Sequence, residues 1–411
     1  MDPTSLLFSS SAIMGHPNLK YCITATAIFI MLIFVTFIML VLFKPITDQP
    51  KVLNLITGDM KLVSVTVLFR HGARAPVVID NETIAKMFPN GPGEITDVGL
   101  SDTFKLGRLL GDRYVKTGFL RTPLLPSEIY IRSRANNRCL FCAAIVGSGM
   151  WAKDENSGFT PVPIYAQEKN DNILEYLKGC PVEISRINKE CGRKPPAFVS
   201  WPLYEGFVYE CTGLIKNNSD LFPNAEAFAN VESLIQMDRN GLPMSEWFNR
   251  NRKRIYELYE KVYHFTVSVV KYHDNELLKL KQGVLMNRIM NDLWKQWGEY
   301  ERHGRVQKKF IAYSTQDWLI MAFLHALGCG EEALGSTIPD FNALVIIELF
   351  EQSKKPMVRI HYKDNKMKMP KDITHAVRSC SFAPCHLIQL GLSVKRYRTD
   401  DPQSVCNMQI A

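Results

Sequence analysis

Short runs of apolar and β-branched residues recur along the chain and predict buried strands. The first runs from Val63 to Phe69, and later runs occupy 129–131, 310–313 and 343–350. Each is too short for a typical helix, and the first ends in a polar, turn-forming segment. We therefore expect these runs to form the strands of a sheet that is covered on both faces.

Between the second and third runs the pattern changes to helical spacing. After the Pro-Met-Ser segment at 243–245, apolar positions recur as at Ile255, Leu258 and Val262, which is typical of an amphipathic helix. Strands that alternate with helices indicate an α/β, doubly wound sheet. We divide this part of the chain into an α/β domain over 61–150 and 306–406 and an inserted, mainly helical segment over 151–305.

A longer apolar segment lies near the start of the chain. Tyr21 to Phe43 are 23 residues without a charge, flanked by Lys20 and Lys44, and this length is enough to span a bilayer. No small-x-small cleavage site comes after it, so we expect an uncleaved signal anchor rather than a removed leader. The chain then has a short tail over 1–20, a transmembrane anchor over 21–43 and a stem over 44–60.

The orientation of this anchor is predicted from the residues on its C-terminal side. Two glycosylation sequons begin at Asn81 and Asn217, and nine of the ten cysteines lie beyond the span. Both features suit an oxidising compartment that is reached by secretion. We therefore predict a single-pass type II membrane protein whose larger domain is lumenal or extracellular.

Composition narrows the function without assigning it. The chain has 411 residues, 46% of them hydrophobic and 22% charged, and a formal net charge of +8. A basic surface could favour anionic substrates, but no dense block of Lys and Arg interleaved with aromatic residues indicates a nucleic-acid partner. No metal-ligand spacing and no phosphate-cradling glycine loop occurs either, so we expect a reaction without metal or cofactor.

The strongest chemical signal comes directly after the first strand. The run that ends at Phe69 leads into Arg70-His71-Gly72-Ala73-Arg74-Ala75-Pro76. Open α/β sheets place their ligands at the carboxyl ends of strands, and Gly72 permits a sharp turn there. Two guanidinium groups match the oxygens of a phosphate, and a histidine held beside them can attack phosphorus.

This segment resembles the histidine acid phosphatases, in the branch that carries Arg-His-Gly-x-Arg-x-Pro. The resemblance continues through about residues 61–406, in segments that include Gly91 to Gly99, Ile129 to Ser133, Ser200-Trp201 and Ala312 to Asp317. It implies a phosphoglycerate-mutase-like fold, in which a doubly wound mixed sheet is flanked by helices and carries a helical cap. It also implies hydrolysis of small-molecule or protein phosphate monoesters. It also implies that dimers are possible. The long insertion and the secretory features distinguish the chain from the related histidine mutases.

The resemblance also implies roles for individual residues. His71 would be the nucleophile that forms a phosphohistidine, and Asp317 would be the general acid. The oxygens of the phosphoryl group would be held by Arg70, Arg74 and Arg132. The dipeptide His273-Asp274, which matches the family's catalytic pair literally, lies in a helical region without a preceding strand, so we interpret it as a surface pair.

The catalytic pair itself departs from the family pattern. Gln316 precedes Asp317 where the family has a histidine. A glutamine amide can donate a hydrogen bond but cannot carry a charge, a loss of about 1–3 kcal/mol. If the loss falls on the transition state, turnover slows roughly tenfold to a hundredfold. An alternative is therefore a catalytically weakened pseudophosphatase that binds phosphate or a phosphorylated ligand.

The cysteines give a partial disulfide pattern by the same resemblance. Cys180 and Cys406 look like the family's long-range pair, and Cys380 and Cys385 like its short local pair. Cys211 matches a third bridging position, but its expected partner position is Ala343. Two other cysteines, at 191 and 329, remain as alternative partners.

Overall fold

The structure is a computed structural model that describes residues 60–79, 82–154, 158–169, 171–198 and 200–408. The tail, the apolar segment 21–43 and nearly all of the stem lie outside these residues, as does Asn81. Within the part described, no helix is both long and apolar enough to cross a bilayer.

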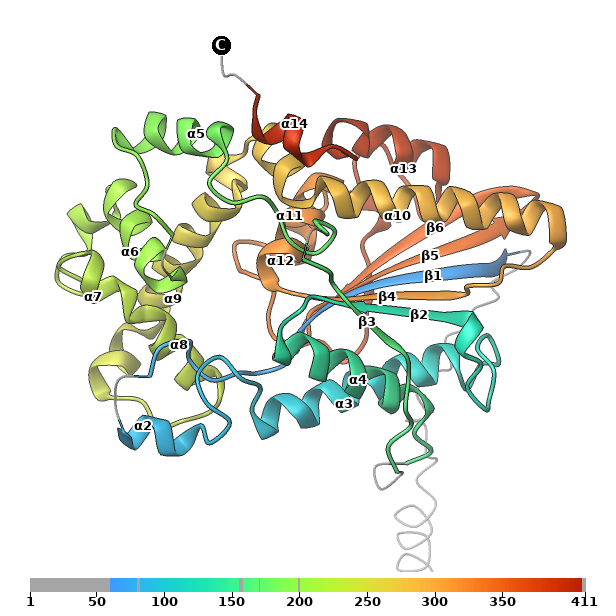
Figure 1. The fold of residues 1–411 in the computed structure, drawn as a ribbon, viewed down its shortest axis with the longest axis horizontal. Coiled ribbons are helices and arrows are strands. Elements are labelled where there is room, and N and C mark those ends of the chain that lie inside the picture. Colours follow the sequence, from blue (N-terminus) through green and yellow to red (C-terminus); the bar gives the residue numbers. More distant parts are fainter. Residues whose placement is uncertain (1–59, 80–81, 155–157, 170, 199, 409–411) are drawn as a thin grey trace, which may run out of the picture. The chain divides into compact units, whose positions relative to one another are not determined.

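A single eight-stranded mixed sheet forms the centre of the domain (Figure 1). Its order is β3-β2-β4-β1-β5-β6-β7, and β8 pairs with β6. The strands from β3 to β1 are parallel, and β5 to β8 add antiparallel pairs. The strands are β1 (Met60–Arg70), β2 (Ile129–Ser133), β3 (Ile164–Ala166), β4 (Phe310–Thr315), β5 (Leu344–Gln352), β6 (Lys355–Lys363), β7 (Lys371–Asp372) and β8 (Cys385–His386).

Side-chain alternation along the central strands explains why both faces are covered. In β1, Val65, Val67 and Phe69 belong to one buried cluster, whereas Leu68 belongs to the other. A register shift between Leu62 and Ser64 interrupts the alternation, and Val63 also belongs to the second cluster. Figure 1 shows the first cluster's helices below the sheet and the second cluster's helices above it. The lower pair is α3 (Asp97–Tyr114) and α4 (Asn137–Trp151), and the upper group is α10 (Asn275–His303), α11 (Asp317–Leu327) and α13 (Leu387–Val394). The predicted mixed α/β sheet with flanking helices is thus confirmed.

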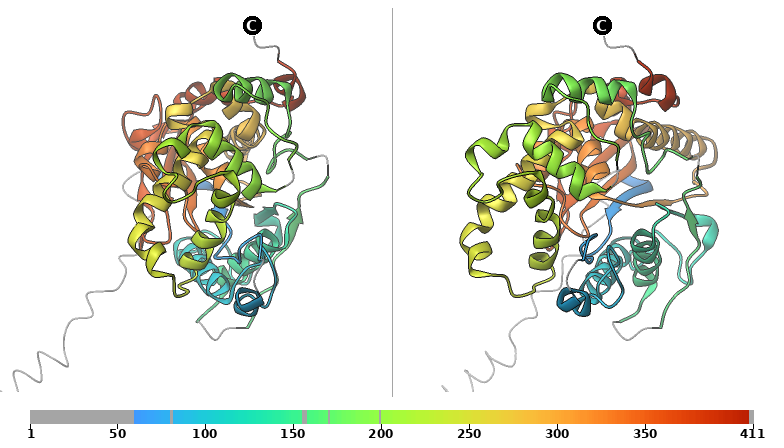
Figure 2. Two further views of the ribbon diagram at one scale, coloured as in Figure 1. Left: turned by 90° about the vertical axis from the view of Figure 1, so that its left-hand side faces the viewer. Right: turned by 60° about the vertical axis from the view of Figure 1, so that its left-hand side comes forward.

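A second group of helices gathers beside the sheet (Figures 1 and 2). It comprises α5 (Pro181–Cys191), α6 (Trp201–Cys211), α7 (Ala225–Ala229), α8 (Val231–Arg239) and α9 (Glu246–Val267). This cap corresponds to the middle of the predicted insertion. The insertion as predicted also contains β3, which pairs with β2, and α10, which contacts β1.

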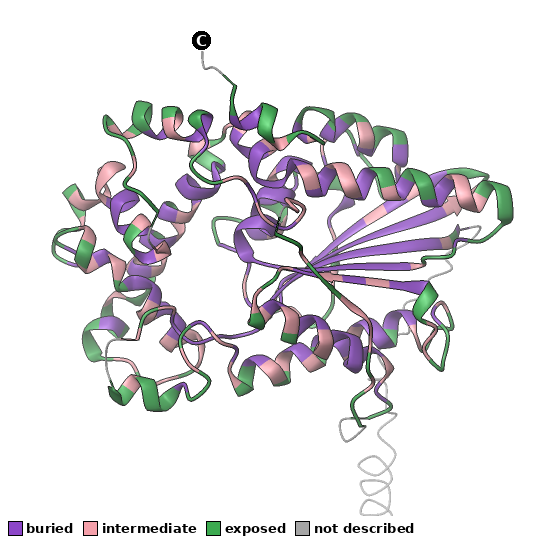
Figure 3. Ribbon diagram, viewed as in Figure 1, coloured by how far each residue is buried: buried purple, intermediate pink, exposed green. Residues whose placement is uncertain are grey.

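The remaining elements are short. Three further helices are α2 (Glu82–Met87), α12 (Gly330–Leu334) and α14 (Pro402–Cys406). The 3-10 turns lie at Pro126–Glu128, Leu214–Asn217, Val270–Tyr272, Thr374–Ala376 and Lys395–Tyr397. Figure 3 shows that the central strands are buried, whereas exposure is concentrated on the outer faces of the surrounding helices. Asn217 is exposed in its 3-10 turn, so its predicted glycosylation is sterically open.

Three disulfide bonds occur among the described residues. They join Cys180 to Cys406, Cys380 to Cys385, and Cys191 to Cys211. The first ties the start of α5 to α14, across 226 residues of sequence, and the third staples α5 to α6 within the cap. Of the two alternatives for Cys211, the structure has the partner at position 191; three buried cysteines, at 139, 142 and 329, are free thiols.

Candidate active site

The site lies where the parallel strands β1 and β4 end side by side. Arg70, the last residue of β1, is in register with Thr315, the last residue of β4. The chain continues from β1 into His71 and from β4 into Gln316, while Asp317 begins α11. Parallel pairing therefore brings two motifs together that are about 240 residues apart in sequence.

His71 is held as a neutral imidazole with one nitrogen free. Its ring Nδ1 lies 2.8 Å from the carbonyl oxygen of Gly72. A carbonyl can only accept, so Nδ1 must carry the proton and Nε2 keeps its lone pair. Burial lowers the pKa of His71 well below its ordinary value, and the positive charges of Arg138, Arg70 and Arg74 lower it further. Burial and the neighbouring positive charges consequently favour the neutral imidazole.

Gly72 is required for close packing rather than for an unusual turn. Its φ is not in the left-handed region. A Cβ at this position would lie 2.5 Å from the carbonyl oxygen of Gly99 and 2.6 Å from the hydroxyl of Thr103. Both atoms belong to α3, so the glycine lets α3 approach the loop that carries His71.

Arg70 and Asp317 form an ion pair across the ends of β1 and α11. Their Nη2 and Oδ2 atoms are 2.6 Å apart, and both side chains are buried. Asp317 also accepts from the hydroxyl of Tyr263 at 3.1 Å and from the backbone N–H of Trp318 at 2.8 Å. Burial alone would raise the pKa of Asp317, but the charges of Arg70 and Arg74 outweigh it, and the pKa is lowered.

Arg74 is oriented by the cap. Its guanidinium lies 2.7 Å from the carboxylate of Glu232 on α8, and both side chains are almost completely buried. The second oxygen of Glu232 accepts from the backbone N–H of Val77. A carboxylate from the insertion thus orients an arginine of the loop that carries His71. No sequence motif indicated this role for Glu232.

A second buried carboxyl group lies close by on α6. Glu205 is 3% exposed. Burial, followed by repulsion from Glu232, raises its pKa well above the ordinary value, although Arg74 opposes the shift. Tyr259 supplies a hydrogen bond. The neutral form of Glu205 is therefore favoured beside the ion pairs of the site.

The third arginine whose charge acts on His71 is Arg138 rather than the predicted Arg132. The guanidinium of Arg132 pairs with Asp171 and donates to the hydroxyl of Tyr130 at 2.8 Å. Arg138, in the first turn of α4, donates to the carbonyl of Gly93 at 3.2 Å. Its charge also lowers the pKa of His71 more than that of any other arginine. These contacts favour Arg138 over Arg132, the residue to which the resemblance assigned this role.

A local sequence signal for Arg138 was available. Asn136 has the side chain typical of a helix N-cap, and in the structure it accepts from the backbone N–H of Cys139. A helix that starts directly after β2 must have its N-terminus at the carboxyl edge of the sheet. A residue in that first turn is better placed to reach the site than one within the strand.

Gln316 is held by two donors from different elements. Its side-chain oxygen accepts from the indole N–H of Trp318 at 2.9 Å and from the guanidinium of Arg134. The other terminal nitrogen of Arg134 pairs with Glu175. Because both contacts use the oxygen, the amide nitrogen of Gln316 is left to donate elsewhere. The sequence analysis did not single out Arg134.

His273-Asp274, the literal match to the family's catalytic pair, has structural contacts elsewhere. Asp274 is the N-cap of α10 and pairs with Arg186 at 2.9 Å. His273 contacts Asn275. The pair thus lies at a helix start rather than within a helix, and it is not part of the His71 site. Across the described ranges, no group of three or more potential His, Cys, Asp or Glu ligands is placed to hold a metal ion.

Comparison with known proteins agrees with this geometry. Residues 80–363 match the model of the histidine phosphatase superfamily, branch 2. The matched span contains Arg138 and Asp317, and it begins just after the loop of His71. Putative acid phosphatase 1 of Caenorhabditis briggsae is 29% identical over 85% of this chain and 83% of its own length. Lysosomal acid phosphatase of Bos taurus is 26% identical over 75% and 72%, respectively.

The fold also matches solved structures. A phytase from Klebsiella sp. ASR1 superimposes with a TM-score of 0.57, over 86% of this chain and 97% of its own, at 13% sequence identity. An identity this low supports the shared fold alone. The fold is therefore a known architecture.

Proposed function

The chain belongs to the histidine phosphatase superfamily, branch 2, and is a phosphatase; from this premise we propose that it hydrolyses phosphate monoesters by a two-step phosphohistidine route. The observation that carries the proposal is the state of His71. A buried, neutral imidazole with a free Nε2, surrounded by guanidinium groups, is arranged to attack an anionic phosphoryl group.

In the first step, Nε2 of His71 forms a bond to phosphorus while the bond to the leaving oxygen breaks. Asp317 gives its proton to the departing alkoxide. In the second step, water attacks phosphorus, Asp317 takes up a proton, and the N–P bond breaks to release phosphate. Arg70, Arg74 and Arg138 would stabilise the charge on the phosphoryl oxygens throughout.

An acidic working range is expected from this assignment. Asp317 must be protonated when it acts, yet Arg70 and Arg74 lower its pKa in the ligand-free protein. A bound phosphate dianion occupies those arginines and adds negative charge beside the carboxyl, which raises its pKa again. His71 remains neutral meanwhile, so the nucleophile is preserved where the acid is protonated. Relatives that are named lysosomal and testicular acid phosphatase support the same range.

The alternative, a phosphate-binding pseudophosphatase, was motivated by Gln316. The contact between Gln316 and Arg134 argues for an active enzyme instead. A guanidinium on the amide oxygen polarises the carboxamide and strengthens the N–H donors on its other side. Positive charge is thereby restored near the position where the family has histidine, and we retain the pseudophosphatase as the second candidate only.

The predicted anchor and orientation complete the proposal. We propose that residues 21–43 hold the enzyme in a membrane with the phosphatase domain on the lumenal or extracellular side. The three disulfides support an oxidising location. The substrate would then be a small-molecule or protein phosphate monoester in that compartment.

The deciding experiment measures phosphate release from an aryl phosphate by the purified full chain, from acidic to neutral pH, with His71→Ala as the blank. Activity above that blank supports the proposal. Equal, background activity in both proteins, together with binding of vanadate by the folded wild type, would favour the pseudophosphatase.

A further inference from the structure

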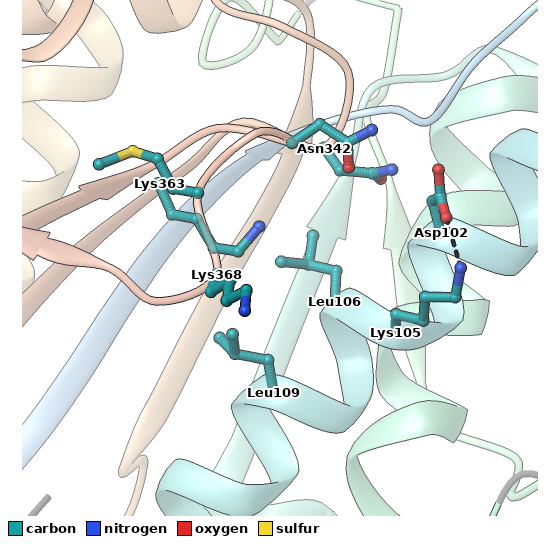
Figure 4. Close-up of a pocket in the computed structure, with 9 residues that line it drawn as sticks. Asp102, Lys105, Leu106, Leu109, Asn342, Lys363 and Lys368 are labelled. Carbon is teal, nitrogen blue, oxygen red and sulfur yellow. Dashed lines mark hydrogen bonds and ion pairs between the residues drawn. The ribbon is translucent and has the colours of Figure 1, made fainter. Parts of the chain in front are cut away.

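A hollow of about 400 Å³ lies between α3 and the segment that joins β6 to β7 (Figure 4). Lys363 and Lys368 enter it from the strand side, and Asp102 and Lys105 border it from α3. None of the residues assigned to catalysis lines it. The hollow is thus a separate feature, on the face of the sheet that α3 covers.

The charges around the hollow do not cancel. Asp102 and Lys105 pair with each other at 2.8 Å. For the other two lysines, no ion pair to a carboxylate occurs within the described ranges. The ammonium of Lys363 instead donates to the backbone carbonyl of Asp364 at 2.8 Å. Burial lowers the pKa of Lys363 despite nearby Asp364 and Asp102, so a further negative charge would favour its protonated form.

A buried donor without an acceptor completes the wall. Asn342 is 2% exposed, and its side-chain oxygen accepts from the hydroxyl of Thr103 at 2.9 Å. Its side-chain nitrogen is buried and has no hydrogen-bond partner in the described part of the chain. Nearly all buried polar groups in proteins are paired, and Asn342, which lines the hollow, has an N–H donor that lacks an acceptor.

We infer that the hollow binds a small tetrahedral oxyanion, of the class of phosphate or sulfate. Lys363 and Lys368 would supply the opposing charge, and the carboxamide nitrogen of Asn342 would donate to one oxygen. The volume accommodates such an ion with its remaining water. This inference does not depend on turnover at His71.

The site would also be coupled to the catalytic loop. The backbone N–H of Asn342 donates to the carbonyl oxygen of His71 at 3.3 Å. Thr103, which holds the side chain of Asn342, lies 3.6 Å from the sulfur of Cys142, and that sulfur accepts from the backbone N–H of Gly72. An anion on Asn342 would therefore bind directly behind the loop that carries the nucleophile.

The test uses radiolabelled sulfate, because it is not hydrolysed, and equilibrium dialysis of the full chain at low ionic strength. We expect Lys363→Gln combined with Lys368→Gln to weaken one class of sulfate binding at least tenfold. The control combines Lys86→Gln and Lys253→Gln, two exposed lysines that pair within their own helices. This control removes the same charge and should leave that class unchanged.

Two further variants separate the hollow from the arginine site. Arg138→Met should weaken sulfate binding at the arginines and leave the hollow intact. Asn342→Asp keeps the side chain's shape but replaces the N–H donor with a carboxylate oxygen. It should abolish sulfate binding in the hollow. Equal binding by the Lys363/Lys368 variant and wild type would overturn the site, as would an equal loss in the lysine control. Retained binding in folded Asn342→Asp would overturn the role of Asn342.

Discussion

The carboxylate of Asp317 lies 2.6 Å from the guanidinium of Arg70. The proposed proton donor and an arginine proposed to bind phosphate therefore neutralise each other's charge in the free protein. A phosphate dianion that enters the site must compete with Asp317 for Arg70. Protonation of Asp317 weakens its hold on the arginine. Acid therefore favours both substrate binding and proton donation through one contact.

Asp317→Asn should separate these two effects. Removing the proton donor is expected to lower kcat on an alkyl phosphate by about 10²–10⁴. An aryl phosphate with a good leaving group should lose much less, because its oxygen departs without a proton. Vanadate should bind more tightly to Asp317→Asn than to wild type, because the neutral amide competes less than a carboxylate for Arg70. Steady-state kinetics on both substrates checks this, and an equal loss on each would contradict the acid assignment.

Arg138→Met and Arg132→Met form a matched pair that tests the corrected arginine. We expect Arg138→Met to lower kcat/KM by about 10²–10³ and Arg132→Met by less than tenfold. Loss of the positive charge at 138 should also raise the pKa of His71, because that charge lowers it in the wild type. The acid-side fall in activity should then move to higher pH in Arg138→Met alone. A larger effect at 132 would restore the original prediction.

The parts of the fold that depend on local pattern were predictable. The four apolar runs lie within or overlap strands β1, β2, β4 and β5. The loop that carries His71 follows directly after β1. These elements are specified by hydrophobic periodicity and by residues adjacent in sequence. The ion pair of Arg70 with Asp317 agrees with the rule that parallel strands end at one edge of a sheet.

The parts that depend on contacts across the chain were not predictable. Glu232 reaches Arg74 from the cap, 158 residues later in sequence, and Glu175 reaches Arg134 from a loop. No spacing rule links such pairs, because the path of the insertion decides which carboxylate meets which arginine. The assignment of Arg132 has a different cause. The resemblance placed the third arginine in the Ile129 to Ser133 segment and did not extend to Arg138 in the first turn of the next helix.

The contact between Arg134 and Gln316 can be tested by a double-mutant cycle. If Arg134 acts by polarising the carboxamide, Arg134→Met should reduce kcat by roughly tenfold. In a Gln316→Ala background it should have little further effect, because the group it acts through is absent. Arg132→Met is the control, since it removes a neighbouring guanidinium that contacts neither residue. Additive losses in the double variant would show that Arg134 acts independently of Gln316.

Gln316→His is informative in the same series. A histidine at this position would place its cation next to the guanidinium of Arg134, which disfavours protonation. We therefore expect Gln316→His alone to leave kcat unchanged or lower it, and Gln316→His with Arg134→Met to raise kcat above the single variant. A higher kcat for Gln316→His alone would mean that Gln316 is only a weaker substitute for the family histidine, and that the surrounding site has not adapted to it.

Glu205 gives a prediction for stability rather than turnover. Burial raises its pKa well above the ordinary value, so the folded protein keeps a proton that the unfolded chain releases as pH rises. The free energy of unfolding therefore decreases as the pH rises from the ordinary carboxyl pKa to the higher pKa of Glu205 in the folded protein. Glu205→Gln cannot ionise, and its amide oxygen can still accept the hydrogen bond from Tyr259. The variant should be similar to wild type in acid and more stable at neutral pH.

Thermal unfolding at a series of pH values measures this difference. We expect the midpoint of Glu205→Gln to exceed that of wild type by a few degrees at neutral pH, because roughly 1 kcal/mol moves the midpoint of a large domain by about 2 °C. Glu232→Gln is the matched control, since it neutralises a neighbouring carboxylate that pairs with Arg74. It should destabilise the protein by leaving that guanidinium buried without its counter-ion. A Glu205→Gln curve parallel to wild type across the range would mean that Glu205 is not held as a neutral acid.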